Sequence, residues 1–300
     1  MGNSEAYPRA NPAIFANLKI VLYGAGSVQS FARNYLGLGI QVVSAWAANA
    51  IPVAEYTVAQ IVLANKGFFQ TSRMYKMNYA QARKLTQQYT GNYGNDVGLL
   101  GAGMIGKKVI ELLRNYNMKV KVYDPFLPDA KAMELGVQKA ELIDIFSTCE
   151  TISNHLANLP ATVGILNKEH FSRMLPYATF INTGRGAQVV EADLIEAMRD
   201  QPMRTALLDV TFPEPIQADS PLLKLDNVIL TPHIAGSMSK EVARMGIYAA
   251  GHAHNRLMQI QMLYFPANYT AKPAIADRNN RSRERVVVQV ERKIGICGMR

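Results

Sequence analysis

A glycine-rich hexapeptide, residues 101–106 (GAGMIG), has the spacing G-x-G-x-x-G. It follows a predicted strand at residues 97–100 and opens a predicted helix. In this spacing Gly101 permits a tight turn, Gly103 lets a pyrophosphate approach the backbone, and Gly106 lets the helix pack closely on the strand. The free amides at the helix start would then meet the phosphate charge. The hexapeptide therefore predicts a phosphate-binding turn.

An acidic residue, Asp124, lies eighteen residues beyond the last glycine, at the end of the next predicted strand. A carboxylate at this position accepts hydrogen bonds from both ribose hydroxyls of an adenosine and repels a 2′-phosphate. The hexapeptide, its strand–turn–helix context and this acid together predict a dinucleotide site that prefers NAD to NADP.

Three further side chains, Arg185, Glu214 and His233, each follow a predicted strand. Active sites of open α/β sheets lie at the carboxyl ends of their strands, so we expect the three to share one edge. An arginine fork can hold a carboxylate and a neighbouring carbonyl oxygen, which a lysine cannot. A histidine paired with a carboxylate can deliver a proton to an alkoxide. The three residues predict redox chemistry on a small acid.

The elements that must position these residues alternate short apolar runs with helical stretches, a pattern typical of a parallel α/β sheet. A polar loop is expected at residues 87–95. Strands are expected at residues 18–23, 40–44, 97–100, 119–123, 151–153, 178–181, 205–208 and 228–230. Helices are expected at residues 31–38, 53–79, 105–116 and 191–199.

The composition, with 49% hydrophobic and 18% charged residues, is that of a globular chain and excludes a disordered or fibrous one. No continuous apolar run approaches the length of a membrane span, and residues 1–20 carry no secretory signal. Two cysteines, Cys149 and Cys297, cannot form a disulfide framework. These features predict a cytoplasmic protein.

His252 and His254 lie two apart on a predicted helix and face different directions, so no metal site is expected.

The net charge of +9 is concentrated at the C-terminal end. Residues 271–300 contain eight Lys or Arg against three acidic residues, so this tenth of the chain holds +5 of the excess. A solvated, partly disordered extension accounts for such a run, and the absence of aromatic residues argues against nucleic-acid binding. Residues 286–290 (VVVQV) could form a strand in this tail.

Taken together, these motifs resemble those of the D-isomer-specific 2-hydroxyacid dehydrogenases, which include glycerate, phosphoglycerate, glyoxylate and D-lactate dehydrogenases. The segments that carry the resemblance are residues 101–106 with Asp124, and residues 182–186 (NTGRG), 209–215 (DVTFPEP) and 231–237 (TPHIAGS). The similarity runs from about residue 18 to the helix after residue 240. It implies an α/β fold: a doubly wound parallel sheet (Rossmann NAD-binding domain) and a second, truncated, flavodoxin-like substrate domain.

The resemblance also implies a function, NAD-dependent hydride transfer with a 2-hydroxy or 2-oxo acid, and a role for each matching residue. Arg185 binds the acid and polarises its carbonyl, His233 is the general acid/base, and Glu214 favours the protonated histidine. Backbone amides of Ala25 and Gly26 bind the substrate carboxylate. The implied cofactor contacts are Gly101, Gly103, Met104, Ile105, Gly106, Asp124, Thr183, Asp209, Ala235 and Gly236, with Asp209 next to the nicotinamide amide.

The family pattern further implies a partial substrate domain at residues 1–52, the NAD-binding domain at 53–236, a returning helix at 237–270 and the basic tail at 271–300. Members of the family normally have additional strand–helix units before the strand at residue 18. The helix from Val53 resembles the family's dimer-forming region, which implies a homodimer. Two alternatives remain open: an NAD-sensing binding protein without catalysis, and an inactive truncated homologue.

Overall fold

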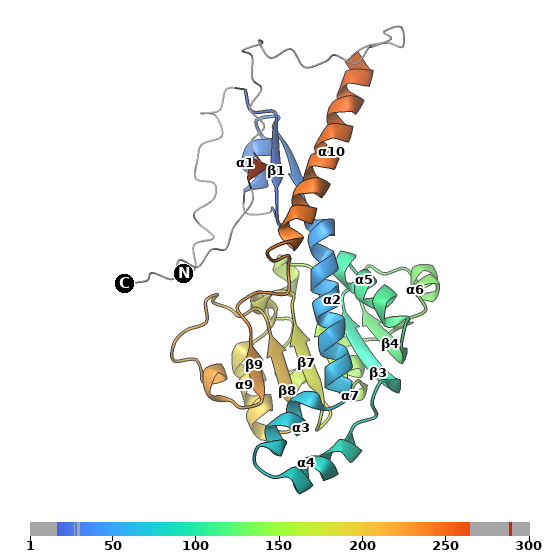
Figure 1. Ribbon diagram of the computed structural model, residues 1–300, viewed down its shortest axis with the longest axis vertical. Helices are drawn as coiled ribbons and strands as arrows, with labels where there is room; N and C mark the ends of the chain where they lie inside the picture. Colours follow the sequence, from blue (N-terminus) through green and yellow to red (C-terminus); the bar gives the residue numbers. More distant parts are fainter. Residues whose placement is uncertain (1–16, 27, 29–30, 265–287, 290–300) are drawn as a thin grey trace. The chain divides into compact units, whose positions relative to one another are not determined.

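The computed structural model describes residues 17–26, 28, 31–264 and 288–289 (Figure 1). The chain divides into two compact units, with boundaries between Asn49 and Ala50 and between Gly236 and Ser237. The sequence places these boundaries after residues 52 and 236. The larger unit contains the glycine hexapeptide and all three residues predicted to do chemistry.

The larger unit is built on a seven-stranded, entirely parallel sheet with the order β5-β4-β3-β6-β7-β8-β9. The winding direction reverses between the neighbouring strands β3 and β6, which is where open α/β sheets bind ligands. This order confirms the predicted doubly wound α/β fold. The strands are β3 (Tyr93–Leu100), β4 (Asn117–Tyr123), β5 (Gln138–Lys139), β6 (Thr151–Asn154), β7 (Thr179–Asn182), β8 (Thr205–Leu208) and β9 (Val228–Leu230).

Helices cover both faces of this sheet. Figure 1 shows α2 and α5 in front of it. The α-helices are α2 (Trp46–Asn65), α3 (Phe68–Tyr75), α4 (Tyr79–Leu85), α5 (Met104–Leu113), α6 (Asp129–Leu135), α7 (Leu142–Thr148), α8 (Lys168–Phe171) and α9 (Glu191–Asp200). Short 3₁₀ turns lie at η3 (Thr86–Gln88), η4 (Pro160–Thr162), η5 (Gly186–Gln188) and η6 (Pro221–Lys224).

In the central strands β3, β7 and β8, alternate residues enter two different hydrophobic cores. Leu99 of β3 packs in the core under α2, α5 and α6, whereas Leu100 packs in the core under α7, α8 and α9. Ile181 of β7 and its neighbour Phe180 divide in the same way. A strand that is buried on both faces reads as a continuous apolar run, which is why these strands can be predicted from the sequence.

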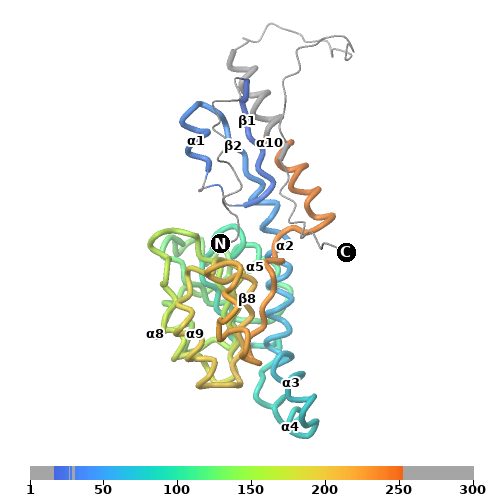
Figure 2. The backbone as a smooth tube through the Cα atoms, turned by 90° about the vertical axis from the view of Figure 1, so that its left-hand side faces the viewer, coloured from blue at the N-terminus to red at the C-terminus, as the bar shows by residue number. Residues whose placement is uncertain are grey.

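The smaller unit contains a three-stranded parallel sheet with the order β10-β1-β2. Its core joins Ile20 and Leu22 of β1 to Met245 and Ala249 of α10, and Figure 2 shows α10 beside β1. The elements are β1 (Ile20–Tyr23), α1 (Ala32–Leu36), β2 (Gln41–Ser44), α10 (Glu241–Tyr264) and β10 (Val288–Gln289).

The helical stretch predicted at residues 53–79 is wrong in its bounds. α2 begins at Trp46 and ends at Asn65, and Gly67 then adopts a left-handed φ of 64° before α3 begins. Glycine takes this conformation without the steric cost of a Cβ, so it ends one helix and lets the next start in a new direction. The loop predicted at residues 87–95 also ends early, because β3 begins at Tyr93.

The sequence has no continuous apolar run as long as a membrane span, yet one helix, α2, is long and apolar enough on average to match one. This helix has 20 residues and a mean hydropathy of 1.2, which meets the length and composition of a span. Polar residues such as Asn49, Glu55 and Gln60 interrupt its apolar runs, and the mean hydropathy that includes them is still 1.2. Half of the segment is buried, and Ala54, Val58 and Ile61 pack in the core against the sheet. We attribute the hydropathy of α2 to this packing.

The C-terminal tail contributes a strand to the smaller sheet. In β10, Val288 lies opposite Leu22 and Gln289 opposite Tyr23, in parallel register with β1. The strand considered possible at residues 286–290 is therefore confirmed for these two residues, which do not belong to a disordered extension. The tail's eight basic residues, its Cys297 and the first sixteen residues of the chain lie outside the described part.

Candidate active site

The glycine hexapeptide forms the turn that its spacing predicts. Gly101 has a φ of 96°, and a Cβ there would lie 2.7 Å from the carbonyl oxygen of His155. A Cβ on Gly106 would overlap the carbonyl oxygen of Gly101. Gly103, the N-cap of α5, has no protein atom within 4 Å of an added Cβ. Packing therefore explains the first and third glycines, while the second faces an open cradle beside the uncapped start of a helix. A pyrophosphate fits this position.

Asp124 lies at the end of β4 with both carboxylate oxygens turned to backbone amides. Its Oδ2 accepts from the N–H of Ala102 at 2.8 Å, and its Oδ1 accepts from the N–H of Phe126 at 2.9 Å. The first bond ties the acid to the glycine turn across 22 residues of sequence. Each carboxylate oxygen has a second lone pair, so the group can still accept from a ribose.

His233 and Glu214 form the pair that the sequence predicts. The Nδ1–H of His233 donates to Oε1 of Glu214 at 2.7 Å, and both side chains are partly exposed. His233 has a φ of 55°, and its backbone N–H lies 3.0 Å from the carbonyl oxygen of Asp209. Nε2 has no hydrogen-bond partner among the described residues, so this ring nitrogen is available to exchange a proton.

Arg185 follows β7 by three residues, in extended backbone, and is half-buried. Its Nη1 donates to the carbonyl oxygen of Gly184 at 2.8 Å, and no carboxylate of the described residues pairs with its guanidinium. The neighbouring Gly186 approaches the backbone of Thr211 so closely that a Cβ would overlap it. The loops after β7 and β8 therefore touch. Arg185 and Glu214 follow adjacent strands at the same sheet edge, as predicted.

Asp209 is almost fully buried and organises the loop that carries His233. Its Oδ1 accepts from the hydroxyl of Thr231 at 2.6 Å and from the N–H of Ile234 at 2.7 Å. Its Oδ2 accepts from the N–H of Ala235 at 3.0 Å. The expected contact of Asp209 with a nicotinamide amide remains a prediction, whereas its hold on residues 231–235 is a structural fact.

Thr183 takes part in a buried polar chain. Its Oγ1 lies 3.3 Å from Oγ1 of Thr57 on α2 and 3.5 Å from Nδ1 of His155, whose Nε2 lies 3.0 Å from Oγ of Ser153. Burial lowers the pKa of His155 to about 4, so this histidine is neutral at physiological pH. His155 is therefore a neutral hydrogen-bonding group that ties the loop after β6 to Ser153 and Thr183.

Three buried amides that sequence reasoning missed hold the same sheet edge together. Asn154 donates from Nδ2 to Asn182 at 3.0 Å and to Gln188 at 2.7 Å. Gln188 in turn donates to the carbonyl oxygens of Leu156 and Ala157. A polar residue at the end of an otherwise apolar strand was the available signal for Asn154 and Asn182. Nothing local marks Gln188, because its partner is 34 residues away.

Ala25 and Gly26 belong to the smaller unit. The hydroxyl of Ser44 lies 2.9 Å from the carbonyl oxygen of Ala25 and 2.6 Å from that of Gly26, so it holds the turn after β1. Ser44 thus bonds the carbonyl oxygens of this turn and not the backbone N–H groups of Ala25 and Gly26. Their expected contact with a substrate carboxylate remains a prediction.

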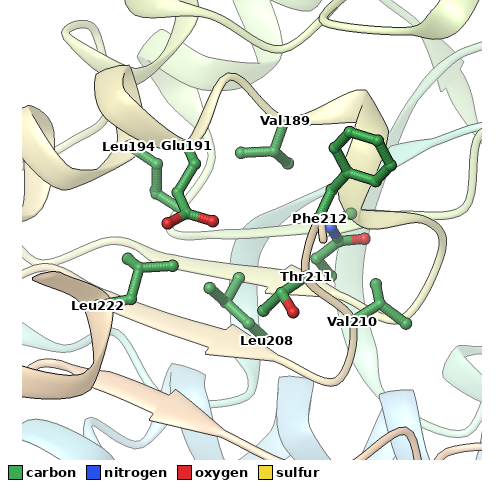
Figure 3. Close-up of a pocket in the computed structure, with 10 residues that line it drawn as sticks. Val189, Glu191, Leu194, Leu208, Val210, Thr211, Phe212 and Leu222 are labelled. Carbon is green, nitrogen blue, oxygen red and sulfur yellow. The ribbon is translucent and has the colours of Figure 1, made fainter. Parts of the chain in front are cut away.

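A small hollow lies beside the predicted chemistry (Figure 3). It has room for about one water molecule, 10 Å³, and is far too small for a dinucleotide. Its lining includes Glu191, Leu208 and Phe212 but none of Asp124, Arg185, Glu214 or His233. In the described part of the chain, no cluster of three or more His, Cys, Asp or Glu could hold a metal ion.

The fold and site define a dinucleotide-binding α/β protein, and comparison with known proteins specifies its family. Residues 58–235 match the family described as "D-isomer specific 2-hydroxyacid dehydrogenase, NAD binding domain", which is more than half of the chain. The chain belongs to this family. The match confirms the predicted resemblance and NAD as the cofactor of the larger unit.

Individual relatives agree with this assignment. D-3-phosphoglycerate dehydrogenase of Archaeoglobus fulgidus is 32% identical over 212 residues, which is 71% of this chain and 40% of that protein. The chain thus spans less than half the length of this relative. D-lactate dehydrogenase with NAD+ from Lactobacillus jensenii shares the fold, with 24% identity, a TM-score of 0.68, and coverage of 80% of this chain and 75% of that one. Phosphoglycerate oxidoreductase from Vibrio cholerae has 25% identity, a TM-score of 0.60, and coverage of 80% and 79%.

Proposed function

We propose that the protein is an oxidoreductase that transfers a hydride between NAD(H) and a small 2-hydroxy or 2-oxo acid, with His233 as the general acid/base. The observation that carries this proposal is the 2.7 Å contact between Nδ1 of His233 and Glu214, which leaves Nε2 for the substrate oxygen. The half-buried Arg185, without a carboxylate partner among the described residues, supports an anionic substrate. The class of relatives named dehydrogenases supports the reaction type.

The residues divide the work in a defined way. The open cradle at Gly103, the helix start at Met104 and Ile105, and the carboxylate of Asp124 would hold the dinucleotide, with Thr183, Asp209, Ala235 and Gly236 as further contacts. The bound nicotinamide supplies the hydride in reduction and accepts it in oxidation. The fork of Arg185 would bind the acid and polarise its carbonyl, while the amides near Ala25 and Gly26 take the carboxylate.

Proton transfer follows from the His233–Glu214 pair. In reduction, protonated His233 gives its Nε2 proton to the developing alkoxide of the substrate. The ionised carboxylate of Glu214 stabilises the positive charge that the imidazole carries before this transfer. In oxidation, neutral His233 removes the hydroxyl proton, and the same carboxylate stabilises the resulting imidazolium.

A panel of 2-oxo acids with NADH, followed by loss of absorbance, tests the activity. His233→Gln should lower turnover by about 10²-fold to 10⁴-fold, which is typical of general acid catalysis.

Arg185→Lys should raise KM and lower kcat, since a point charge cannot replace a two-pronged contact. Glu214→Gln should lower turnover, since it removes the carboxylate that pairs with Nδ1 of His233. Retained NADH binding without turnover of any acid by the native protein would favour the NAD-sensing alternative. Full activity of the His233 variant would exclude the mechanism.

We also propose a cytoplasmic homodimer. Four large side chains on α3, on α4 and in the turn between them are between 48% and 70% exposed: Phe68, Tyr75, Met77 and Tyr79. A cluster of exposed aromatic and methionine side chains is typical of an interface. Sedimentation should show a dimer that Tyr79→Glu dissociates and that Tyr116→Glu, at an exposed position elsewhere, leaves intact. A monomeric native protein would exclude the dimer.

A further inference from the structure

The hydroxyl of Tyr56 on α2 reaches the loop that carries His233. Its Oη lies 3.3 Å from Oγ1 of Thr231, across 175 residues of sequence. Both side chains are half-buried. Tyr56 forms no hydrogen bond with Glu214 or with the imidazole of His233. Any effect of its hydroxyl on proton transfer by His233 must therefore act through Thr231.

The direction of the hydrogen bonds follows from the groups involved. Oγ1 of Thr231 lies 2.6 Å from Oδ1 of Asp209, and a carboxylate can only accept. Thr231 therefore donates its one hydroxyl proton to the carboxylate of Asp209. Its oxygen is then left to accept, so the phenol of Tyr56 donates to Thr231. The result is a relay with a single direction, from Tyr56 to Thr231 to Asp209.

Asp209 in turn fixes the backbone around His233 by hydrogen bonds. Its carboxylate accepts from the amides of Ile234 and Ala235, and the backbone N–H of His233 lies 3.0 Å from its carbonyl oxygen. His233 itself needs this support, because its φ of 55° is unfavourable for a residue with a Cβ. The relay thus holds the backbone that aims the imidazole at Glu214 and at the substrate.

We propose that Tyr56 is a positioning residue for the general acid/base His233. This inference rests on the proposed function, because it concerns the same proton transfer. At 3.3 Å the contact from Tyr56 is a long one for two hydroxyls, so its loss changes the rate moderately. A small displacement of a catalytic group is enough to produce such a change.

The kinetic test compares Tyr56→Phe, which removes only the hydroxyl, with Tyr116→Phe, which removes a hydroxyl from an exposed tyrosine on the same unit. Tyr56→Phe should lower kcat for the best 2-oxo acid by about three-fold to ten-fold, with KM and the Kd for NADH changed less than about two-fold. Thr231→Val should give a loss at least as large, and Thr231→Ser, which keeps the hydroxyl, should restore most of the rate. In the double variant Tyr56→Phe/Thr231→Val the losses should not add, since one relay is broken twice.

A second readout does not depend on turnover. Amide hydrogen exchange at Ile234 and Ala235 and the ¹⁵N resonances of the His233 ring should change in Tyr56→Phe and stay unchanged in Tyr116→Phe. If the native protein reduces none of the acids, the proposed function fails, and this readout still decides whether Tyr56 holds the loop. Unchanged exchange, unchanged ring resonances and unchanged kcat in Tyr56→Phe would overturn the inference. A lower melting temperature with an unchanged ring environment would also overturn it, since it would show a merely structural role.

Discussion

At the scale of single residues, Asp124 serves the glycine turn and, in our proposal, the adenosine ribose. Asp124→Asn keeps an oxygen for the N–H of Ala102 but removes the negative charge. We expect it to narrow the preference for NADH over NADPH by about ten-fold or more, since hydrogen bonds to charged groups contribute about 1.5 to 3 kcal/mol. Asp124→Ala, which also releases the turn, should weaken both cofactors. Fluorescence titration gives the four affinities. Equal binding of NADH and NADPH by the native protein would show that this carboxylate does not select the cofactor.

His155 makes a prediction about acid stability. Its folded pKa of about 4 lies below the unfolded value of about 6.5, so the unfolded chain binds the proton first as the pH falls. The contribution of His155 to the free energy of unfolding is therefore fully present above pH 6.5. As the pH falls from 6.5 to 4, up to about 3 kcal/mol of that free energy is lost. Urea unfolding of His155→Gln should therefore show a flatter pH dependence in this window. His252→Gln, at an exposed position on α10, should keep the native slope, and equal slopes in all three proteins would contradict the assignment.

At the scale of elements, Arg204 joins α8, α9 and the start of β8. Its buried guanidinium donates only to carbonyl oxygens, those of Phe171, Ser172, Met174, Leu175 and Ala197. Arg204→Met removes all of these donated hydrogen bonds, although the carbonyl oxygens of Phe171 and Leu175 each keep a backbone N–H donor. We expect the free energy of unfolding to fall by about 3 kcal/mol. Arg199→Met, on the exposed face of α9, is the matched control. A change below about 1 kcal/mol in Arg204→Met would mean that water replaces the guanidinium.

At the scale of the whole molecule, we expect the C-terminal tail to stabilise the smaller unit through β10. Removing residues 271–300 deletes β10 and leaves β1 with an unpaired edge. Calorimetry should show a lower melting temperature for the smaller unit, while NADH binding by the larger unit is retained. Removing only residues 290–300 keeps β10 and is the control. An unchanged melting profile after the longer deletion would show that β10 adds no stability.

The sequence by itself determined the parts of this protein that depend on neighbours along the chain. The turn at residues 101–106, the acid at Asp124 and the polar residues after β7, β8 and β9 all follow from local patterns and from the rule that parallel strands end at one edge. Because the central strands are buried on both faces and apolar, they could be predicted as well. The edge strand β5 (Gln138–Lys139) could not, since it is two exposed polar residues.

Only the tertiary structure decided the contacts between distant segments. The donation from Tyr56 to Thr231 crosses 175 residues, the carbonyl partners of Arg204 come from two other elements, and β10 pairs with a strand near the other end of the chain. A hydroxyl or a guanidinium carries no sequence signal of the acceptor that it will meet. A two-residue strand such as β10 likewise has too short a sequence pattern to indicate which strand it pairs with. These interactions exist because the packed sheet brings the groups together, and burial then requires each polar group to be paired.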